Sequence, residues 1–134
     1  MAGEVGVPRV GPNIGWRWLV VAAYVALIFT LSAQPYLRIP GTFEYRDKVA
    51  HIIEYGILGF LVWRAARDTW PTQKPVNRAL IVWLAIMALG ACDEKFQAFI
   101  PGRESSVYDW IADSTGGLLA QLWGLSREMR REVG

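Results

Sequence analysis

The stretch DEKFQAFIPGRESSVYDWIAD, residues 93–113, joins two strongly apolar segments of the chain, yet it is itself rich in charged and amide side chains. The apolar run before it, residues 79–92, is shorter than the about 20 helical residues needed to cross a bilayer core. A helix that spans the membrane here must therefore carry Asp93, Glu94 and Gln97 with it. Because ionisable groups cost free energy at that depth, we expect these residues to serve a function.

The overall composition indicates a single membrane domain. Of the 134 residues, 53% are hydrophobic and 19% are charged, and the formal net charge is only +2. Lys and Arg residues are dispersed rather than gathered in a stripe, which argues against a nucleic-acid partner. The single cysteine, Cys92, excludes an internal disulfide and a cysteine-based metal cluster. We interpret Cys92 as a small core residue because it lies in an apolar run.

Hydropathy and helix-terminus signals predict an all-α fold, an integral membrane bundle of four transmembrane helices. Asn77 is the predicted N-cap of the third helix, and Pro101-Gly102 the signal that ends it. The predicted helices cover residues 16–33, residues 47–66, residues 78–100, and the segment from Ser105 or Ser106 to about Leu125.

Outside the helices, residues 1–15 are predicted to form a flexible tail and residues 126–134 a charged C-terminal tail, with the transmembrane domain at 16–125. A cleaved signal peptide is the alternative interpretation of the first apolar run. That run is long for a signal peptide, and Leu31 fits poorly at the −3 position of a cleavage site. We therefore favour an uncleaved helix.

The distribution of basic residues predicts the topology, because cytoplasmic segments carry an excess of Lys and Arg. Nine of the 14 basic residues fall on the side of the two termini and five on the opposite side. Both termini are therefore predicted to be cytoplasmic. The nine are Arg9, Arg17, Arg64, Arg67, Lys74, Arg78, Arg127, Arg130 and Arg131, and the five are Arg38, Arg46, Lys48, Lys95 and Arg103.

With this topology, the unusual polar residues gather on the outward half of the helices. Residues four apart lie on one helix face. This spacing occurs in the second, third and fourth predicted helices, and together they predict an outward-facing acidic pocket. The pairs are Asp47 with His51 (Tyr55 follows four residues later), Asp93 with Gln97, and Asp109 with Asp113.

A second pattern in the fourth predicted helix is a face of small residues, Ala112, Gly116, Ala120 and Gly124. Small residues at four-residue intervals let a neighbouring helix approach closely. The neighbour is either another helix of this chain or a second copy, in which case the face would form an oligomer.

Several of these residues also have structural interpretations. Asp47 and Asp109 would complement helix N-termini, and Ser106-x-x-Asp109 resembles a capping box. His51 could be a hydrogen-bonded core histidine, and Arg103 could extend to lipid headgroups. These interpretations are weakest for Asp93, Glu94 and Asp113, whose burial without a purpose would be costly.

The residues also carry a family resemblance. Three motifs, Asp47-Lys48-x-x-His51-x-x-x-Tyr55-x-x-Leu58-Gly59, Asp93-Glu94-x-x-Gln97-x-Phe99-x-Pro101-x-Arg103 and Asp109-x-x-x-Asp113-x-x-Gly116, resemble those of the VanZ-like family, as does Ser32-x-x-Pro35. The resemblance covers roughly residues 20–124. It implies a small multi-pass protein of the bacterial cell membrane, with a cell-envelope role and a link through the namesake to teicoplanin resistance. Asp113 departs from the Asn usual in the family.

Three hypotheses for function follow. The first is a module that binds a polar cell-envelope ligand, such as a lipid-linked precursor, a headgroup or a glycopeptide antibiotic. A cationic side chain would suit a phosphate or carboxylate on that ligand. The ligand-binding candidates are Asp47, Lys48, Tyr55, Gln97, Arg103 and Asp109.

The second hypothesis is an intramembrane hydrolase or transferase acting on a lipid-linked phosphate. His51, the only histidine, is a natural general acid or base, with Glu94 and Asp113 as further catalytic candidates. A divalent cation such as Mg²⁺ would have Asp93, Glu94, Asp109 and Asp113 as candidate ligands. The third hypothesis, an ion or proton pathway, is disfavoured because the inner half of the helices is apolar.

Overall fold

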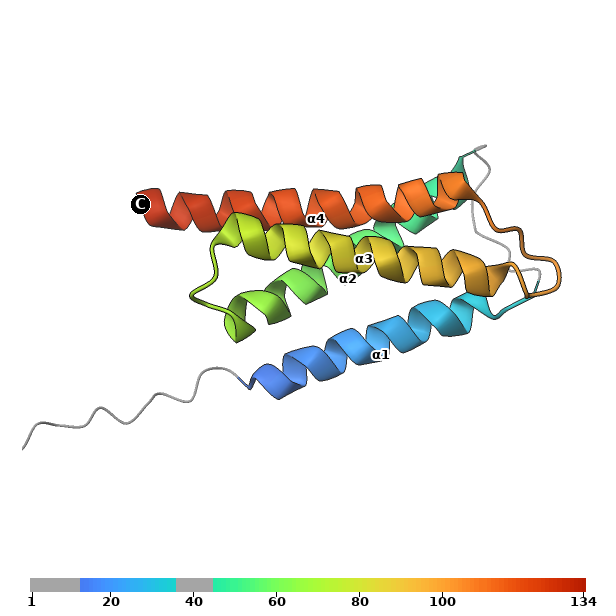
Figure 1. Cartoon of the computed structure of the whole chain (residues 1–134), viewed down its shortest axis with the longest axis horizontal. Helices are drawn as coiled ribbons and strands as arrows, with labels where there is room; N and C mark the ends of the chain where they lie inside the picture. The colour runs from blue at the N-terminus through green and yellow to red at the C-terminus, as the bar shows by residue number, and fades with distance from the viewer. Residues whose placement is uncertain (1–12, 36–44) are drawn as a thin grey trace, which may run out of the picture.

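The computed structural model describes residues 13–35 and 45–134, which form four α-helices and no strand. This confirms the all-α, four-helix prediction. The helices run alternately in opposite directions, so the beginning of α1 and the end of α4 lie at the same end of the bundle (Figure 1). Three of them, α1 to α3, are long and apolar enough to cross a membrane. The helices are α1 (Ile14–Ser32), α2 (Arg46–Thr69), α3 (Pro75–Gln97) and α4 (Val107–Val133).

The helix boundaries differ from the predicted ones where capping and long-range contacts act. The Asn77 N-cap is wrong: Pro75 occupies the first turn of α3 and Lys74 is the N-cap, as the fixed φ of proline favours. Helix α4 continues past the predicted end near Leu125 to Val133. The added turns are held by Glu128, which contacts α2 and α3. Of the predicted tail at residues 1–15, residues 1–12 lie outside the described residues, as does Arg38, and helix α1 already begins at Ile14.

Helix α2 lies at the centre of the packing, and its most extensive contact is with α4. The shared core includes the fully buried side chains of Tyr55 and Leu58 from α2 and of Ile28 from α1. Helix α1 joins the bundle along α2: Tyr24 Oη donates to the carbonyl oxygen of Glu54 at 2.9 Å. In the described part of the chain, α1 makes no contact with α4.

The small-residue face of α4 packs against α2 within this chain. A Cβ atom added to Gly116 would lie 2.3 Å from the carbonyl oxygen of Ile52, and one added to Gly124 would lie 2.4 Å from Nε1 of Trp63. Both distances are far below normal contact, so α2 and α4 approach this closely only because these positions are glycine. An oligomer formed through this face stays a prediction.

Cys92 does not belong to the core. It lies on an exposed face of α3, so its predicted core role is wrong. In a bundle of apolar helices, an apolar run marks the outer surface as readily as the interior, because that surface can face lipid.

Candidate functional site

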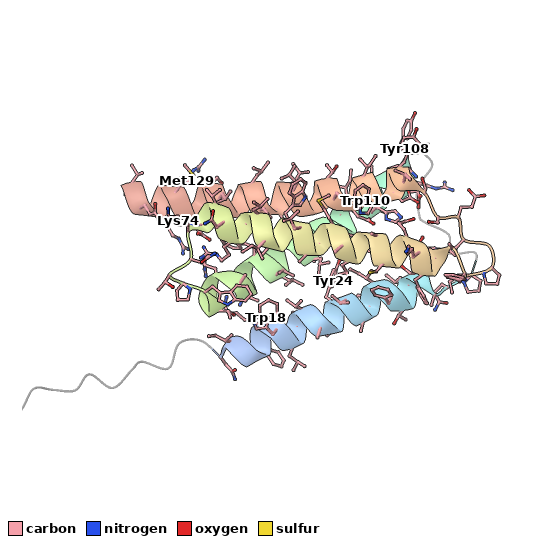
Figure 2. The ribbon with its side chains drawn as sticks, viewed as in Figure 1. Trp18, Tyr24, Lys74, Tyr108, Trp110 and Met129 are labelled. Atoms are coloured by element: carbon pink, nitrogen blue, oxygen red, sulfur yellow. The ribbon has the colours of Figure 1, made fainter. Side chains whose placement is uncertain are left out.

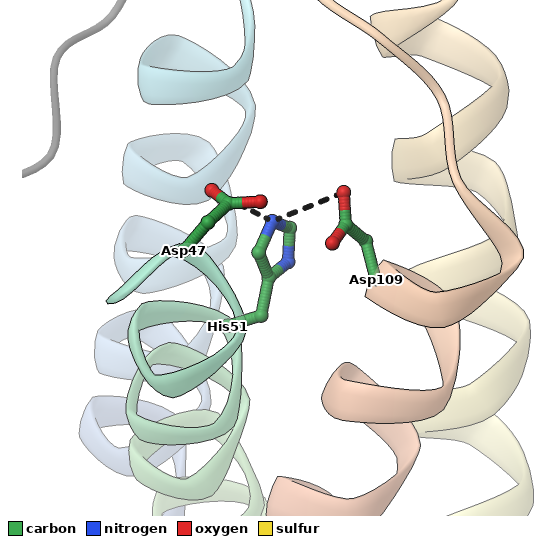
Figure 3. A group of neighbouring side chains, drawn as sticks. All are labelled: Asp47, His51 and Asp109. Atoms are coloured by element: carbon green, nitrogen blue, oxygen red, sulfur yellow. Dashed lines mark ion pairs between the residues drawn. The ribbon is translucent and has the colours of Figure 1, made fainter. Parts of the chain in front are cut away.

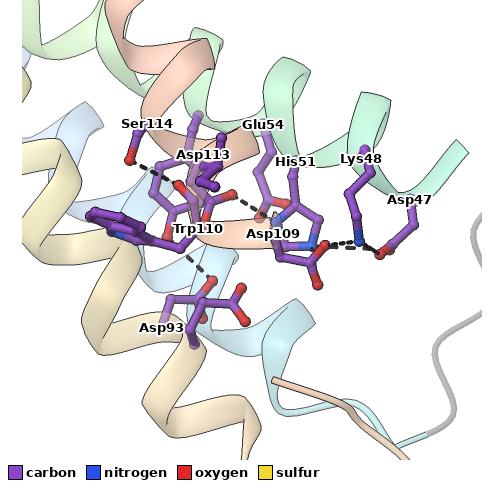
Figure 4. A network of polar contacts seen from close by, with 12 residues as sticks. Asp47, Lys48, His51, Glu54, Asp93, Asp109, Trp110, Asp113 and Ser114 are labelled. Carbon is purple, nitrogen blue, oxygen red and sulfur yellow. Dashed lines mark hydrogen bonds and ion pairs between the residues drawn. The ribbon is translucent and has the colours of Figure 1, made fainter. Parts of the chain in front are cut away.

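Six polar residues from three helices meet at the end of the bundle opposite the termini, and we call them the His51 cluster. Helix α2 contributes its first two turns, α4 does the same, and α3 contributes its C-terminal turn. The antiparallel packing of the helices therefore brings distant residues together at one end (Figures 1 and 4). The cluster consists of Asp47, Lys48, His51, Glu94, Asp109 and Asp113.

The imidazole of His51 lies between carboxylates on both of its edges. Its Nδ1 atom is 2.7 Å from Oδ1 of Asp113, a hydrogen-bond distance. Its Nε2 atom is 3.8 Å from Oδ2 of Asp109 and 4.0 Å from Oδ1 of Asp47 (Figure 3). The predicted i,i+4 pairs on α2 and α4 thus do face one another. His51 is buried, as expected of a hydrogen-bonded core histidine, and each of these three partners is a carboxylate.

Lys48 is held by two carboxylates of the same cluster. Its ammonium group pairs closely with Asp109 and lies 3.5 Å from Oδ2 of Asp47 (Figure 4). An anionic ligand would have to compete with these two carboxylates for Lys48, whose role in ligand binding stays a prediction.

The cluster has a buried floor and a partly open rim. Asp113 is 0% exposed and Glu94 and His51 are each 6% exposed, whereas the side chains of Asp47 and Lys48 are 48% and 35% exposed. Charged groups are almost never fully buried unless they are paired. The floor is therefore the costly part of this arrangement.

Two oxygen atoms of the floor are left without a partner. Glu94 accepts a hydrogen bond from the backbone N–H of Ser106 through Oε2 at 3.0 Å, and Asp113 contacts His51 through Oδ1. The second oxygens, Oε1 of Glu94 and Oδ2 of Asp113, are buried and receive no hydrogen bond from any residue in the described ranges. Each carboxylate is thus oriented by one oxygen and unsatisfied at the other.

Asp93 belongs to a separate group of residues, the Asp93 network. Its Oδ2 atom accepts hydrogen bonds from Tyr55 Oη at 3.2 Å and from Gln97 Nε2 at 3.3 Å. Gln97 also donates to the hydroxyl of Ser32 on α1 at 3.2 Å. Tyr55, Gln97 and Asp93 thus form a buried cross-link among α1, α2 and α3 at the same end of the bundle as the His51 cluster (Figure 4). That they share one ligand pocket with the other acidic residues stays a prediction, and Ser32 was not among the predicted site residues.

The connection between α3 and α4 shapes the site. The predicted capping box is not formed: Ser106 Oγ accepts from the N–H of Tyr108, and the Ser106 N–H goes to Glu94 instead of Asp109. Asp109 is thereby free to pair with Lys48. Arg103 is half-buried in this connection. The role of Ser106 in orienting Glu94 had no local sequence signal, because the two residues are 12 positions apart.

A large cavity lies elsewhere, at the end where α1 begins and α4 ends. It measures about 690 Å³ and is lined by charged residues that include Arg67, Asp68, Arg78 and Glu128. Its least exposed charged residues are already paired, Asp68 with Arg17 at 2.7 Å and Arg78 with Glu128 at 2.5 Å. Size alone does not make this the functional site, and the unsatisfied oxygens favour the His51 cluster.

Comparison with known proteins gives one match. A family model described as VanZ/LLP1 matches residues 16–125, which include all of the His51 cluster and the Asp93 network. The chain belongs to the VanZ/LLP1 family. Searches of curated proteins and of solved structures return no match. Membership confirms the resemblance carried by the three sequence motifs. In this VanZ/LLP1 chain, the fold brings the motifs together where α2, α3 and α4 meet.

Proposed function

We propose that this VanZ/LLP1 protein spans the bacterial cell membrane four times, with both termini in the cytoplasm and the His51 cluster facing outward. Helices α1, α2 and α3 have the length and composition of membrane spans. Basic residues concentrate at the end that carries the termini, as the positive-inside rule requires of the cytoplasmic side. The His51 cluster lies where α2 and α4 begin and α3 ends, and Figure 1 shows these helix ends at the opposite end of the bundle.

The surface of α4 supports its role as the fourth span. Its polar residues Asp109, Asp113 and Gln121 are buried against the neighbouring helices. Large apolar side chains make up its exposed face, and the exposed Thr115 returns its hydroxyl to the carbonyl oxygen of Ile111. This face is compatible with lipid although the average hydropathy of the helix is low. The exposed large apolar residues of α4, two of which (Tyr108 and Met129) are labelled in Figure 2, are Val107, Tyr108, Ile111, Leu119, Leu122, Trp123, Met129 and Val133.

Cysteine accessibility tests this topology. In a Cys92→Ala background, Glu104→Cys in the α3–α4 connection should react in intact cells with a membrane-impermeant thiol reagent. Lys74→Cys before α3 should react only after the cells are opened. If Lys74→Cys reacted in intact cells and Glu104→Cys reacted only after the cells were opened, the proposed orientation would be wrong.

We further propose that the rim of the cluster binds the polar part of a cell-envelope ligand, such as a lipid-linked precursor or a glycopeptide, in an envelope or teicoplanin-resistance role. The observation that carries this proposal is the partly exposed charged rim above a buried acidic floor. Asp47 and Lys48 form the rim, Lys48 pairs with the buried Asp109, and Arg103 lies in the connection at the same end. Such paired groups can exchange partners with a ligand that carries both charges.

A binding assay with the detergent-purified protein tests the rim. Labelled teicoplanin and a labelled lipid-linked precursor are the probes. Lys48→Ala and Arg103→Ala should each weaken binding of the true ligand at least tenfold. Lys95→Ala is the matched control, because Lys95 is exposed on α3 near the same end. Equal binding by all variants would contradict the proposal.

The second candidate function, a hydrolase or transferase acting on a lipid-linked phosphate, is favoured by one contact. The 2.7 Å approach of Asp113 to Nδ1 of His51 orients an imidazole as enzymes orient a general base. Phosphate release from a lipid-linked phosphate by the wild type, abolished by His51→Ala, would support it. Turnover that survives His51→Ala would remove it.

A further inference from the structure

We propose that His51, Glu94 and Asp113 together bind one divalent transition-metal ion. Each side chain offers one ligand atom, these atoms lie within 4.8 Å of one another, and all three residues are buried. They come from α2, α3 and α4, so the ion would join the three helices that meet at this end. The inference rests on the proposed function in one respect: the ion would lie beneath the ligand that we propose to bind at the rim.

The unsatisfied oxygens are the observation that points to a cation. Oε1 of Glu94 and Oδ2 of Asp113 are buried and have no hydrogen-bond donor in the described part of the chain. Leaving a buried acceptor unsatisfied costs about 1–3 kcal/mol, and more when the group is charged. A metal ion removes this penalty at both residues at once.

The histidine is oriented for the same purpose. A metal-bound histidine usually directs its other ring N–H towards a carboxylate, which fixes the tautomer. Without a metal, the 2.7 Å contact between Nδ1 of His51 and Oδ1 of Asp113 is held by a proton shared between them. A metal ion would replace that proton, and the N–H on Nε2 would then face Asp109 and Asp47, 3.8 Å and 4.0 Å away.

A second group of possible ligands, Asp47, His51 and Asp109, is less suited to a metal. Its ligand atoms also lie within 4.8 Å of one another, but Asp47 is only partly buried. Lys48 already places its ammonium group between Asp47 and Asp109. Lys48 therefore neutralises the side of the imidazole that faces Asp47 and Asp109. Among residues 13–35 and 45–134, no lysine or arginine forms an ion pair with Glu94 or Asp113 on the other side.

The donor set indicates which metal binds. One imidazole and two carboxylates suit a borderline ion such as Zn²⁺, whereas Mg²⁺ prefers oxygen ligands throughout. Asp93, which would have completed an all-oxygen set, is engaged with Tyr55 and Gln97. We therefore expect Zn²⁺ to bind more tightly than Mg²⁺, with three protein ligands as in catalytic zinc sites.

Direct metal binding tests the inference. The full chain, purified in detergent without a histidine tag and stripped with a chelator, is dialysed against Zn²⁺ or Mg²⁺, and bound metal is measured by elemental analysis. We expect one tightly bound Zn²⁺ per chain and weaker Mg²⁺ binding. Asp113→Asn and Glu94→Gln should each lower Zn²⁺ affinity at least tenfold, with helix content and elution volume showing that the variants fold.

Asp93→Asn is the matched control, since it makes the same chemical change in a neighbouring buried aspartate outside the site, and it should retain Zn²⁺. Any of three results would overturn the inference: no bound Zn²⁺ in the wild type, Zn²⁺ retention by Asp113→Asn and Glu94→Gln equal to that of the wild type, or tighter binding of Mg²⁺ than of Zn²⁺. The dialysis contains no envelope ligand. If Zn²⁺ does not bind while the envelope ligand still binds, the metal site alone is wrong. If Zn²⁺ binds while the envelope ligand does not, the proposed ligand site at the rim alone is wrong.

Discussion

Polar groups are buried at both ends of the bundle, but the two ends satisfy them to different degrees. At the end with the termini, Arg78 donates to the carbonyl oxygens of Trp70 and Gln73 and pairs with Glu128, which also accepts from Trp63. Of the Arg78 nitrogens, Nε alone is buried without a partner among the described residues. We call these five residues the Arg78 network.

The His51 end is left open by comparison. Three of its buried carboxylates, those of Asp93, Glu94 and Asp113, each keep one oxygen without a hydrogen bond from the described residues. Nearly all buried polar groups in proteins have a partner, so the exceptions require an explanation. The Arg78 network links helices α2, α3 and α4, and this contrast supports the proposal that the His51 cluster binds a cation.

The largest expected effect is on stability at the Arg78 end. Arg78→Ala leaves the partly buried Glu128 without its cation, and breaking a buried pair costs about 3–5 kcal/mol. The melting temperature in detergent should fall sharply, while Arg130→Ala, an exposed change on α4, should leave it unchanged. If both variants melted like the wild type, the structural role of the network would be wrong.

Next in size is the close approach of α2 and α4 beside the cluster. Gly116→Ala would force its new Cβ to within 2.3 Å of the Ile52 carbonyl oxygen unless the helices separate. Overpacking of this kind costs about 1–3 kcal/mol and should also weaken Zn²⁺ binding. Gly56→Ala is the control on the facing helix, since its Cβ would make an ordinary 3.7 Å contact. Unfolding midpoints and dialysis measure both effects, and identical behaviour of the two variants would contradict the packing.

A smaller effect of opposite sign is expected at Glu94. In metal-free protein, Glu94→Gln removes a buried unpaired charge and keeps an oxygen able to accept from Ser106. We expect the unfolding free energy to rise by about 1 kcal/mol. A loss of stability in chelator-treated protein would show that the carboxylate is already compensated, and the contrast between the two ends would weaken.

The smallest effect is expected in the Asp93 network. Tyr55→Phe removes one hydrogen bond to Asp93 and should cost about 1 kcal/mol without changing Zn²⁺ affinity. Tyr108→Phe, at an exposed position, is the control. Loss of Zn²⁺ on Tyr55→Phe would show that the network and the cluster form one site.

Local periodicity predicted much of this arrangement. The four-residue spacing on α2 and α4 placed His51 and Asp113 on facing sides, because helix geometry is set within a few residues. The division between Asp93 and Glu94 was not predictable in the same way. Adjacent helical residues point about 100° apart, and only the rotation of the packed helix decides which neighbour each one meets.

Long-range contacts account for the other differences. Helix α4 passes Leu125 because Glu128 is held by Arg78, which is 50 residues away in sequence. From their charged composition alone, residues 126–134 are predicted to form a tail, because the contact between Glu128 and Arg78 has no signal in the local sequence. In the same way, nothing near Ser106 in sequence shows that its N–H orients Glu94 rather than closing a capping box.

Thermal unfolding with and without Zn²⁺ tests most directly the claim that the acidic end, and not the basic end, binds a cation. A ligand at 100 times its Kd stabilises the folded state by about 2.7 kcal/mol, so the wild-type midpoint should rise with Zn²⁺ concentration. The unfolding midpoint of Arg78→Ala should rise by the same amount from a lower starting temperature, and the midpoint of Glu94→Gln should not rise. An equal rise in Glu94→Gln and wild type would contradict the account.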